Sequence, residues 1–504
     1  MSNGNSYRQI LRSTSIIGGA SIINIAVGLL RTKVAAVLLG PAGVGIIGLF
    51  QSLLAIASSV SSLGFGSVGT RQIAEATGRL DLQVVAAARR ALFWGTLGLA
   101  ALGTSIFWLV RDILAETVLG NVGFKDSLGW LALGVGLTVV SGSQTALLNG
   151  LRRMGDIARV SVFSALLSTI LGVASLCLWG DKGVVAFVLS TPLATFLIGR
   201  WYVSRLPKVV ASPTSLSQMI GQWKTLARLG TAFTIAGLVE TVGLLAVRTC
   251  VEKQLGAEAL GHFQAAWLIS MTYIGFVLQA MGTDYYPRLA ANISNNAATN
   301  RLVNEQTEVA LLLAGPAFVA MLGFAPWVIE LLYSSQFDEA VVVLRWQVLG
   351  DILKVACWPL GFIVLAAGAG RTFMLLQTLG IATLVIFTWI GVPLIGLQAT
   401  GVASLAMYLV YLPAVYWLAW RRTGFSWLPR IAFQLFALMA ASVLVFLCGV
   451  WSTRGAAVFG LLATLLFGVY GLARIGHMLD LKGPLRHLAA MSKRVMISIG
   501  VWHE

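Results

Sequence analysis

Apolar runs long enough to cross a membrane recur along this chain from Ile16 to Ala473, with only short polar breaks between them. A bilayer span needs about 20 mainly apolar residues. Only 11% of the 504 residues are charged and 58% are hydrophobic, whereas about 25% of residues are charged in soluble domains. A soluble globule is therefore excluded, and the sequence predicts an all-α polytopic membrane protein.

Charged residues, Gly and Pro divide these runs into fourteen predicted transmembrane helices. Their limits are 13–39, 44–70, 88–110, 127–149, 158–179, 183–203, 230–251, 257–285, 305–333, 339–367, 372–393, 398–420, 429–450 and 455–474. The connections are short, so no large aqueous domain is expected.

The basic residues are distributed unevenly between the two sides of this arrangement. With the N-terminus in the cytoplasm, 25 of the 35 Lys and Arg residues fall on the cytoplasmic side and only five fall in the opposite loops. Under the positive-inside rule this bias predicts that both termini are cytoplasmic. The basic excess thus sets membrane topology, and we expect no nucleic-acid partner.

The chain also contains an internal repeat. Leu30-Arg31-Thr32 and the segment from Leu39-Gly40 to Gly45 are echoed by Val247-Arg248-Thr249 and the segment from Leu255-Gly256 to Gly261. Six predicted spans separate the copies, and an even number requires the two halves to share one orientation. Parallel repeats of this kind are a transporter architecture, with the substrate path between the halves.

Motifs for cofactors, metals and catalysis are absent from the sequence or lie in the wrong context. The segment 64–69 matches the Gly-rich dinucleotide fingerprint, but it lies near the end of a predicted apolar helix and not after a strand, so helix packing or a local bend explains it better. The four histidines form no metal-binding spacing. We therefore expect no cofactor, no metal site, no catalytic residues and no enzymatic activity.

Charged residues inside the predicted spans are the candidate functional groups. Each costs roughly 2.5–3.5 kcal/mol near mid-membrane on insertion scales, so such residues usually face a bundle interior or an aqueous cavity. Cations in such a cavity attract an anionic substrate such as a phosphate. We predict that the embedded cations bind substrate: Arg31, Lys33, Arg248, Arg345 and Lys354.

The embedded acids are the candidates for ion coupling. Glu240, Asp351 and Asp284 lie within predicted spans, and Glu240 is the first choice because it lies deepest in an apolar run. Structural explanations remain open for several of these charges. Arg31, Lys33 and Arg248 could snorkel to the outer interface, and the i,i+3 spacing of Asp351 and Lys354 allows a purely structural ion pair.

Several ordered segments together resemble a known family, the O-antigen and enterobacterial common antigen lipid flippases of the multidrug/oligosaccharidyl-lipid/polysaccharide exporter superfamily. The resemblance extends from about residue 10 to 422. The segments that carry it are Leu39-Gly40-Pro41-Ala42-Gly43-Val44-Gly45 with Phe50-Gln51, Leu148-Asn149-Gly150-Leu151-Arg152-Arg153, Asp284-Tyr285-Tyr286-Pro287-Arg288-Leu289, Leu349-Gly350-Asp351-Ile352-Leu353-Lys354 and Trp358-Pro359.

The resemblance implies a two-lobed bundle that moves an undecaprenyl-diphosphate-linked oligosaccharide, such as an O-antigen repeat unit, from the cytoplasmic to the periplasmic leaflet of the bacterial inner membrane. An ion gradient would drive the movement. The lobes would be residues 1–210 and 211–425, each with six helices, and residues 426–504 would add two further helices and a basic cytoplasmic tail. The lipid-linked glycan and membrane lipids are the expected partners, and a glycan polymerase and a chain-length regulator could join them.

Two other functions stay open at this stage. A multidrug antiporter of the same fold would rely on acidic and aromatic cavity groups, whereas the embedded cations favour an anionic substrate. A membrane glycosyltransferase or polymerase would carry a sizeable extracytoplasmic loop, but the longest one predicted here, 111–126, spans about sixteen residues.

Overall fold

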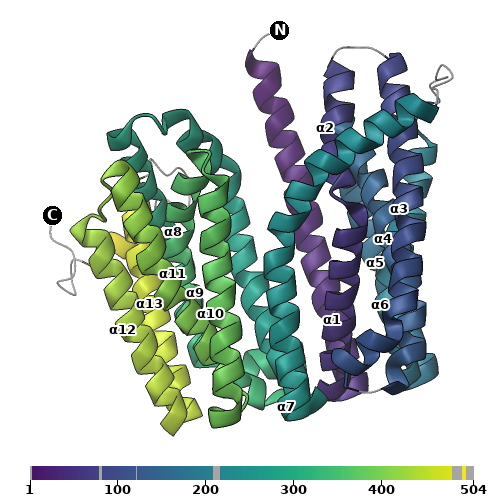
Figure 1. The fold of residues 1–504 in the computed structure, drawn as a ribbon. Helices are drawn as coiled ribbons and strands as arrows, with labels where there is room; N and C mark the ends of the chain where they lie inside the picture. The colour runs from purple at the N-terminus through teal and green to yellow at the C-terminus, as the bar shows by residue number, and fades with distance from the viewer. Residues whose placement is uncertain are drawn as a thin grey trace. The chain divides into compact units, whose positions relative to one another are not determined.

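The computed structural model describes residues 3–78, 82–120, 122–207, 216–478, 491–494 and 496. Every regular element in these ranges is helical (Figure 1), which confirms the all-α prediction. The α-helices are α1 (Asn3–Ser62), α2 (Phe65–Gly78), α3 (Leu82–Thr117), α4 (Lys125–Gly150), α5 (Met154–Trp179), α6 (Val184–Ser204), α7 (Leu216–Asn292), α8 (Asn296–Leu332), α9 (Glu339–Ala366), α10 (Gly370–Ile395), α11 (Gln398–Thr423), α12 (Pro429–Trp451) and α13 (Thr453–Met478). Three short 3₁₀ turns join them: Val122–Phe124, Gly180–Gly183 and Ser335–Phe337.

The two longest helices are each bent at a glycine of the sequence repeat. Gly40 divides α1 with φ 64°, and Gly256 divides α7 with φ 86°. Positive φ is a conformation that residues with a Cβ rarely adopt, so glycine is required at each bend. Both copies of the repeat therefore form the same local structure, a bend between two helical arms.

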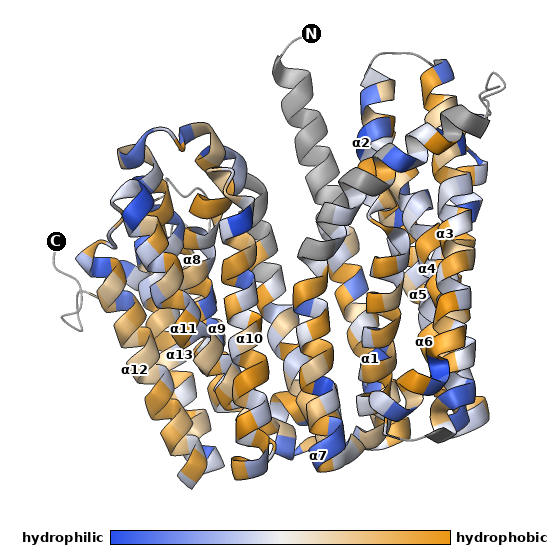
Figure 2. Cartoon of the chain, in the orientation of Figure 1, coloured by the Kyte–Doolittle hydropathy of each residue, from blue (hydrophilic) through white to orange (hydrophobic). Residues whose placement is uncertain are grey.

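Ten helical segments of the described chain are long and apolar enough to span a membrane. Two of them, Gly18–Ser62 and Met154–Ser204, each cover two of the predicted spans, and the two arms of α7 cover two more. With these segments divided, the structure contains the fourteen predicted helices. Figure 2 shows hydrophobic residues along the middle of the helices and hydrophilic residues toward their ends, as expected for segments immersed in hydrocarbon.

One predicted boundary lies elsewhere in the structure. The span expected to run to residue 70 ends at Ser62, where Leu63 and Gly64 both have positive φ, and α2 starts at Phe65. The Gly-rich segment 64–69 therefore forms a turn between two helices, with Gly64 against the backbone of Gly230. A local bend, not a nucleotide-binding loop, explains that motif.

The contacts divide the chain into two compact units. The first comprises Met1–Gly261 with Leu332–Ser334, and the second comprises His262–Leu331 with Ser335–Glu504. The lobe boundaries at 210/211 and 425/426 stay a prediction, and most of the basic tail lies outside the described residues.

In the first unit, α1 packs against α5, α3 against α4, and α5 against α6. A buried apolar cluster that includes Phe65, Leu148, Tyr202 and Leu226 joins α2, α4, α6 and the start of α7. Burial of such large side chains stabilises a helix bundle through close packing.

The additional C-terminal helices belong to the second unit and pack on α8. Glu308 of α8, which is 2% exposed at its side chain, accepts from Arg430 of α12 at 2.7 Å and from Arg474 of α13 at 2.8 Å. Nearby, a Cβ on Gly460 of α13 would lie 2.8 Å from Gly323 Cα of α8, so the two helices approach through their glycines. The two added helices are thus an integral part of this unit.

Candidate hydroxyl-lined cavity in the first unit

Arg31, on the first arm of α1, is held by α5 and α6. Its Nη1 donates to Ser168 Oγ at 3.0 Å and to Thr191 Oγ1 at 2.5 Å, and its Nη2 donates to the carbonyl oxygen of Phe187 at 2.5 Å and to Ser190 Oγ at 3.0 Å. The guanidinium carbon also lies 4.3 Å from the centroid of the Phe187 ring. The cation is therefore oriented into the unit by hydroxyls and by a ring face.

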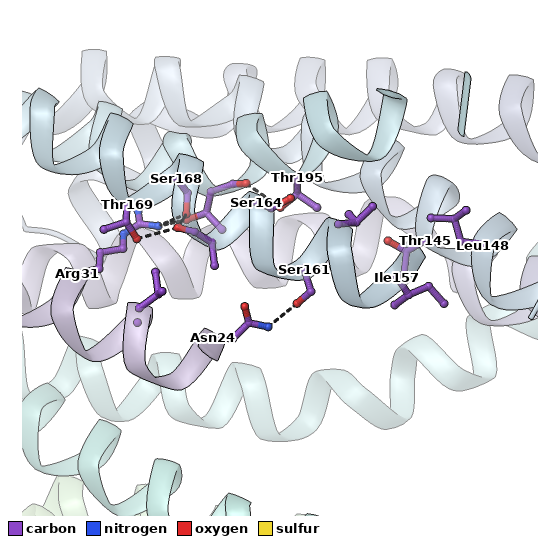
Figure 3. Close-up of a pocket in the computed structure, with 15 residues that line it drawn as sticks. Asn24, Arg31, Thr145, Leu148, Ile157, Ser161, Ser164, Ser168, Thr169 and Thr195 are labelled. Atoms are coloured by element: carbon purple, nitrogen blue, oxygen red, sulfur yellow. Dashed lines mark hydrogen bonds between the residues drawn. The ribbon is translucent and has the colours of Figure 1, made fainter. Parts of the chain in front are cut away.

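A cavity of about 420 Å³ lies beside Arg31 (Figure 3). Asn24 enters it from α1, where its Nδ2 donates to Ser161 Oγ at 2.6 Å, and its Oδ1 has no hydrogen-bond partner among the described residues. Among the described residues, the lining contains one cation, no carboxylate and seven hydroxyl side chains: Thr145, Ser161, Ser164, Ser168, Thr169, Thr191 and Thr195. Hydroxyls and amides donate and accept, so this surface can hydrogen-bond phosphate oxygens and sugar hydroxyls.

The hydroxyls of this cavity are the functional groups that our sequence analysis missed. Ser161, Ser164 and Ser168 follow i, i+3 and i+7 spacing, which places them on one face of α5. In the structure Ser168 Oγ also bonds its own helix at the carbonyl of Ala165, at 3.0 Å, which lets an apolar span carry a hydroxyl at little cost. Helical periodicity of Ser and Thr within an apolar run was the available signal.

The other two cations of the duplicated helices do not line this cavity. Arg248 of α7 is 8% exposed, and its Nη1 donates to Ser52 Oγ of the second arm of α1. Lys33 is half-buried on α1. That Arg248 and Lys33 bind substrate stays a prediction.

Arg345 of α9 has a different environment, in the second unit. It is 6% exposed, its Nε donates to the Leu322 carbonyl of α8 at 3.3 Å, and its Nη1 donates to the Gly449 carbonyl of α12 at 2.8 Å. Arg345 thus joins three helices through backbone carbonyls, a contact that orients α12.

Asp351 of α9 is almost fully buried and lies beside α7. Its Oδ2 accepts from Ser270 Oγ at 2.6 Å and from the Tyr273 hydroxyl at 2.8 Å, and its Oδ1 has no hydrogen-bond partner among the described residues. Lys354, one turn further on, lies 3.5 Å from the Met271 sulfur and 5.9 Å from the centroid of the Tyr408 ring.

The two other acids that were predicted to couple ions are Glu240 and Asp284. Glu240 lies on the first arm of α7 with an exposed side chain, and the side chain of Asp284 lies outside the described residues. Within the described part of the chain, no group of three or more His, Cys, Asp or Glu side chains could hold a metal ion.

Comparisons with known proteins agree with this architecture. Residues 34–342 match the family described as polysaccharide biosynthesis protein. The chain is 25% identical over 419 residues to the lipid III flippase of Escherichia coli (strain K12), which covers 80% of this chain and 97% of that protein. The Shigella flexneri lipid III flippase matches to the same extent.

Solved structures show the same fold. An inward-facing multidrug resistance MATE family transporter of the MOP superfamily superposes with a TM-score of 0.69 at 17% identity, covering 80% of this chain and 98% of that chain. The lipid II flippase MurJ, in an inward closed conformation, superposes with a TM-score of 0.68 at 11% identity, covering 91% and 99%.

The fold and the ten candidate spans of the described residues together define a multi-pass membrane protein with the fold of the MATE transporter and MurJ. The chain belongs to the polysaccharide biosynthesis protein family.

Proposed function

We propose that this protein moves an undecaprenyl-diphosphate-linked oligosaccharide, such as an O-antigen repeat unit, from the cytoplasmic to the periplasmic leaflet of the bacterial inner membrane. The observation that carries the proposal is Arg31 at a cavity of seven hydroxyls and one amide inside a membrane-spanning unit. A diphosphate and its sugars cannot cross hydrocarbon without substitute partners for the water they lose. A cavity of about 420 Å³ holds a part of such a head group, a phosphate or a sugar, and not the whole of it.

Exchanging Arg31 for Gln is expected to reduce transport by about tenfold or more, because hydrogen bonds to a charged group contribute roughly 1.5–3 kcal/mol each. Arg31→Lys should recover little, since a single ammonium lacks the planar fork of donors. The measurement is the movement of a lipid-linked oligosaccharide across proteoliposome membranes. Folding should survive, because Ser190 Oγ keeps its bond to the Phe187 carbonyl at 2.7 Å.

The matched control is Arg71→Gln. Arg71 pairs with Glu75 at 2.7 Å on α2, and its side chain is 74% exposed, so its loss should leave transport unchanged. Wild-type transport by a well-folded Arg31→Gln protein would remove the cavity from the substrate path.

The alternative function is that of a multidrug antiporter, which the similarity in fold to the MATE transporter supports. A cationic drug would need an anionic or aromatic site, whereas the described residues that line the cavity include an arginine and no carboxylate. The same proteoliposomes separate the two functions, because an antiporter would move a cationic dye and leave the lipid-linked glycan in place.

We propose Asp351 as the leading ion-coupling group, ahead of Glu240 and Asp284, because it is buried with an unpartnered oxygen. Asp351→Asn keeps the size and the acceptor toward Ser270 and Tyr273 but cannot exchange a proton. Transport against a substrate gradient should then stop responding to an imposed pH or sodium gradient, while downhill movement continues. An undiminished response in Asp351→Asn would return the role to Glu240, tested in parallel as Glu240→Gln.

Both termini are proposed to be cytoplasmic, on the basis of the charge bias. Reporter fusions after residues 119, 254 and 453 should then be active in the periplasm, and fusions after 155 and 424 in the cytoplasm. A periplasmic signal from a fusion after 155 or 424 would contradict this orientation.

A further inference from the structure

A second and larger hollow lies in the first unit, away from Arg31. This groove, of about 1320 Å³, runs between α3, α4 and α6. None of its described lining residues lines the hydroxyl-lined cavity. On α4, Thr145 and Leu148 line the cavity, whereas Ser143 and Leu147 line the groove. The two hollows thus lie against different faces of the same helix and can be tested separately.

The charge of the groove lies at one end. Four arginines line it: Arg89 and Arg90 near the start of α3, Arg153 at the α4–α5 turn and Arg200 near the end of α6. No acid lines it among the residues that the structure describes. Arg89 and Arg200 are close enough to repel one another. Arg153 also pairs with Asp156, which lies outside the lining, at 3.3 Å. Like charges gathered in this way favour an anion between them.

The rest of the groove is long and mainly apolar, with Thr104, Ser143 and Gln144 as its uncharged polar side chains. From Arg89 the lining continues along α3 to Thr104, a rise of about 22 Å at 1.5 Å per residue. Leu97 of α3, Leu137 of α4 and Phe196 of α6 contribute to it. One leaflet of hydrocarbon is about 15 Å deep, half of a bilayer core. A hydrocarbon chain attached to an anion at the arginine end therefore fits the whole depth of a leaflet.

The position of the arginines indicates which leaflet faces the groove. All four belong to the set of basic residues that the charge bias assigns to the cytoplasmic side. Anionic lipids give the cytoplasmic leaflet its negative surface, and basic pockets between transmembrane helices on that side bind their head groups.

We infer that this groove, which we call the α3–α4–α6 groove, is a binding site for an anionic phospholipid of the cytoplasmic leaflet. The phosphate lies among Arg89, Arg90, Arg153 and Arg200, and the acyl chains occupy the apolar length. A glycan head group suits the site less well, because the uncharged polar side chains of the lining lie deeper: Ser143 is seven residues before the end of α4 at Gly150, about 10 Å along the helix.

Photo-crosslinking tests the site without reference to transport. The full-length protein is placed in phosphatidylcholine vesicles containing a trace of phosphatidylglycerol with a photoreactive group in one acyl chain, and crosslinked peptides are mapped after irradiation. Crosslinks are expected on α3 and α4 around Leu97 and Leu137. Arg89→Gln/Arg200→Gln should reduce them by about tenfold or more, because each basic residue near the surface contributes about 1 kcal/mol to anionic-lipid binding.

Two further variants keep the test decisive. Arg71→Gln removes an exposed arginine from the predicted cytoplasmic side and should leave the crosslinks unchanged. Ala101→Trp keeps all four arginines but fills the groove from α3, where Ala101 is exposed in the lining, so it should also abolish the crosslinks. Retention of the crosslinks by both the double arginine variant and Ala101→Trp would overturn the proposal.

Two outcomes with the wild-type protein would also overturn it. Equal labelling by a photoreactive phosphatidylcholine would show an apolar slot with no preference for anions. Displacement of the probe by undecaprenyl diphosphate at concentrations where unlabelled phosphatidylglycerol has no effect would assign the groove to the polyprenyl substrate. The expected result is displacement by phosphatidylglycerol, weakened by added salt.

Discussion

Replacing Glu308 by alanine is expected to destabilise the second unit by about 3–5 kcal/mol, the usual cost of removing one partner from a buried ion pair. Its carboxylate lies between Arg430 at 2.7 Å and Arg474 at 2.8 Å, and both arginines would lose their anion. The measurement is thermal unfolding of the detergent-solubilised protein, followed by loss of the monodisperse peak in size-exclusion chromatography.

Glu305→Ala is the matched control on the same helix. Glu305 pairs with Arg301 at 2.7 Å, but both side chains are exposed, by 48% and 81%, so the loss should be below about 1 kcal/mol. Replacing Glu308, Arg430 and Arg474 together by leucine should restore most of the stability, because an apolar triad leaves no buried charge without a partner. Equal unfolding temperatures for Glu308→Ala and Glu305→Ala would contradict the assigned role of Glu308.

Gly261→Val is expected to lower the free energy of unfolding by about 3 kcal/mol or more, which is the upper range for overpacking. The folded yield should therefore fall severely. A Cβ on Gly261 would overlap the backbone of Pro41, and a Cβ on Gly45 would lie 2.6 Å from the carbonyl oxygen of Ala257. Backbone atoms cannot move aside as a flexible side chain can, so the second arm of α1 would have to separate from α7. Membrane abundance and thermal unfolding measure the effect.

Gly237→Val provides the comparison, because Gly237 also lies on α7 and no atom of the described residues lies within 4 Å of a Cβ added there. It should fold like the wild type. If Gly261→Val unfolds at the same temperature as Gly237→Val, the close approach of α1 and α7 at this point does not exist in the folded protein.

The glycines of the sequence repeat show which structural features the repeat predicts and which it does not. Gly40 and Gly256 were matched by sequence, and both adopt positive φ at the bends of α1 and α7. The sequence match predicted that these two positions are structurally equivalent. It did not say that Gly45 and Gly261, the next matched pair, would be the points at which the two helices touch, because an alignment carries no information on which faces meet.

The charges inside the spans show the same limit. Arg31 was found because a cation in hydrocarbon is costly and needs a reason. Its partner Ser168 lies 137 residues away, and no local pattern pairs residues over that distance. Glu308 was not among the predicted functional residues, because the sequence does not show which cations lie beside it. Its two arginines, 122 and 166 residues away, were assigned to cytoplasmic ends, and only packing of α12 and α13 on α8 brings them to one carboxylate.

The sequence by itself determined the membrane-spanning class, the number of helices, the repeat and the family, because hydropathy over about 20 residues and glycine at a bend are local requirements of a bilayer and of a backbone. The tertiary structure alone decided which hydroxyls surround Arg31, which side chains bury Asp351 and Glu308, and where four arginines meet at one end of an apolar groove. These features depend on which helix faces pack together, and packing is settled by shape and burial summed over residues that are distant in the chain.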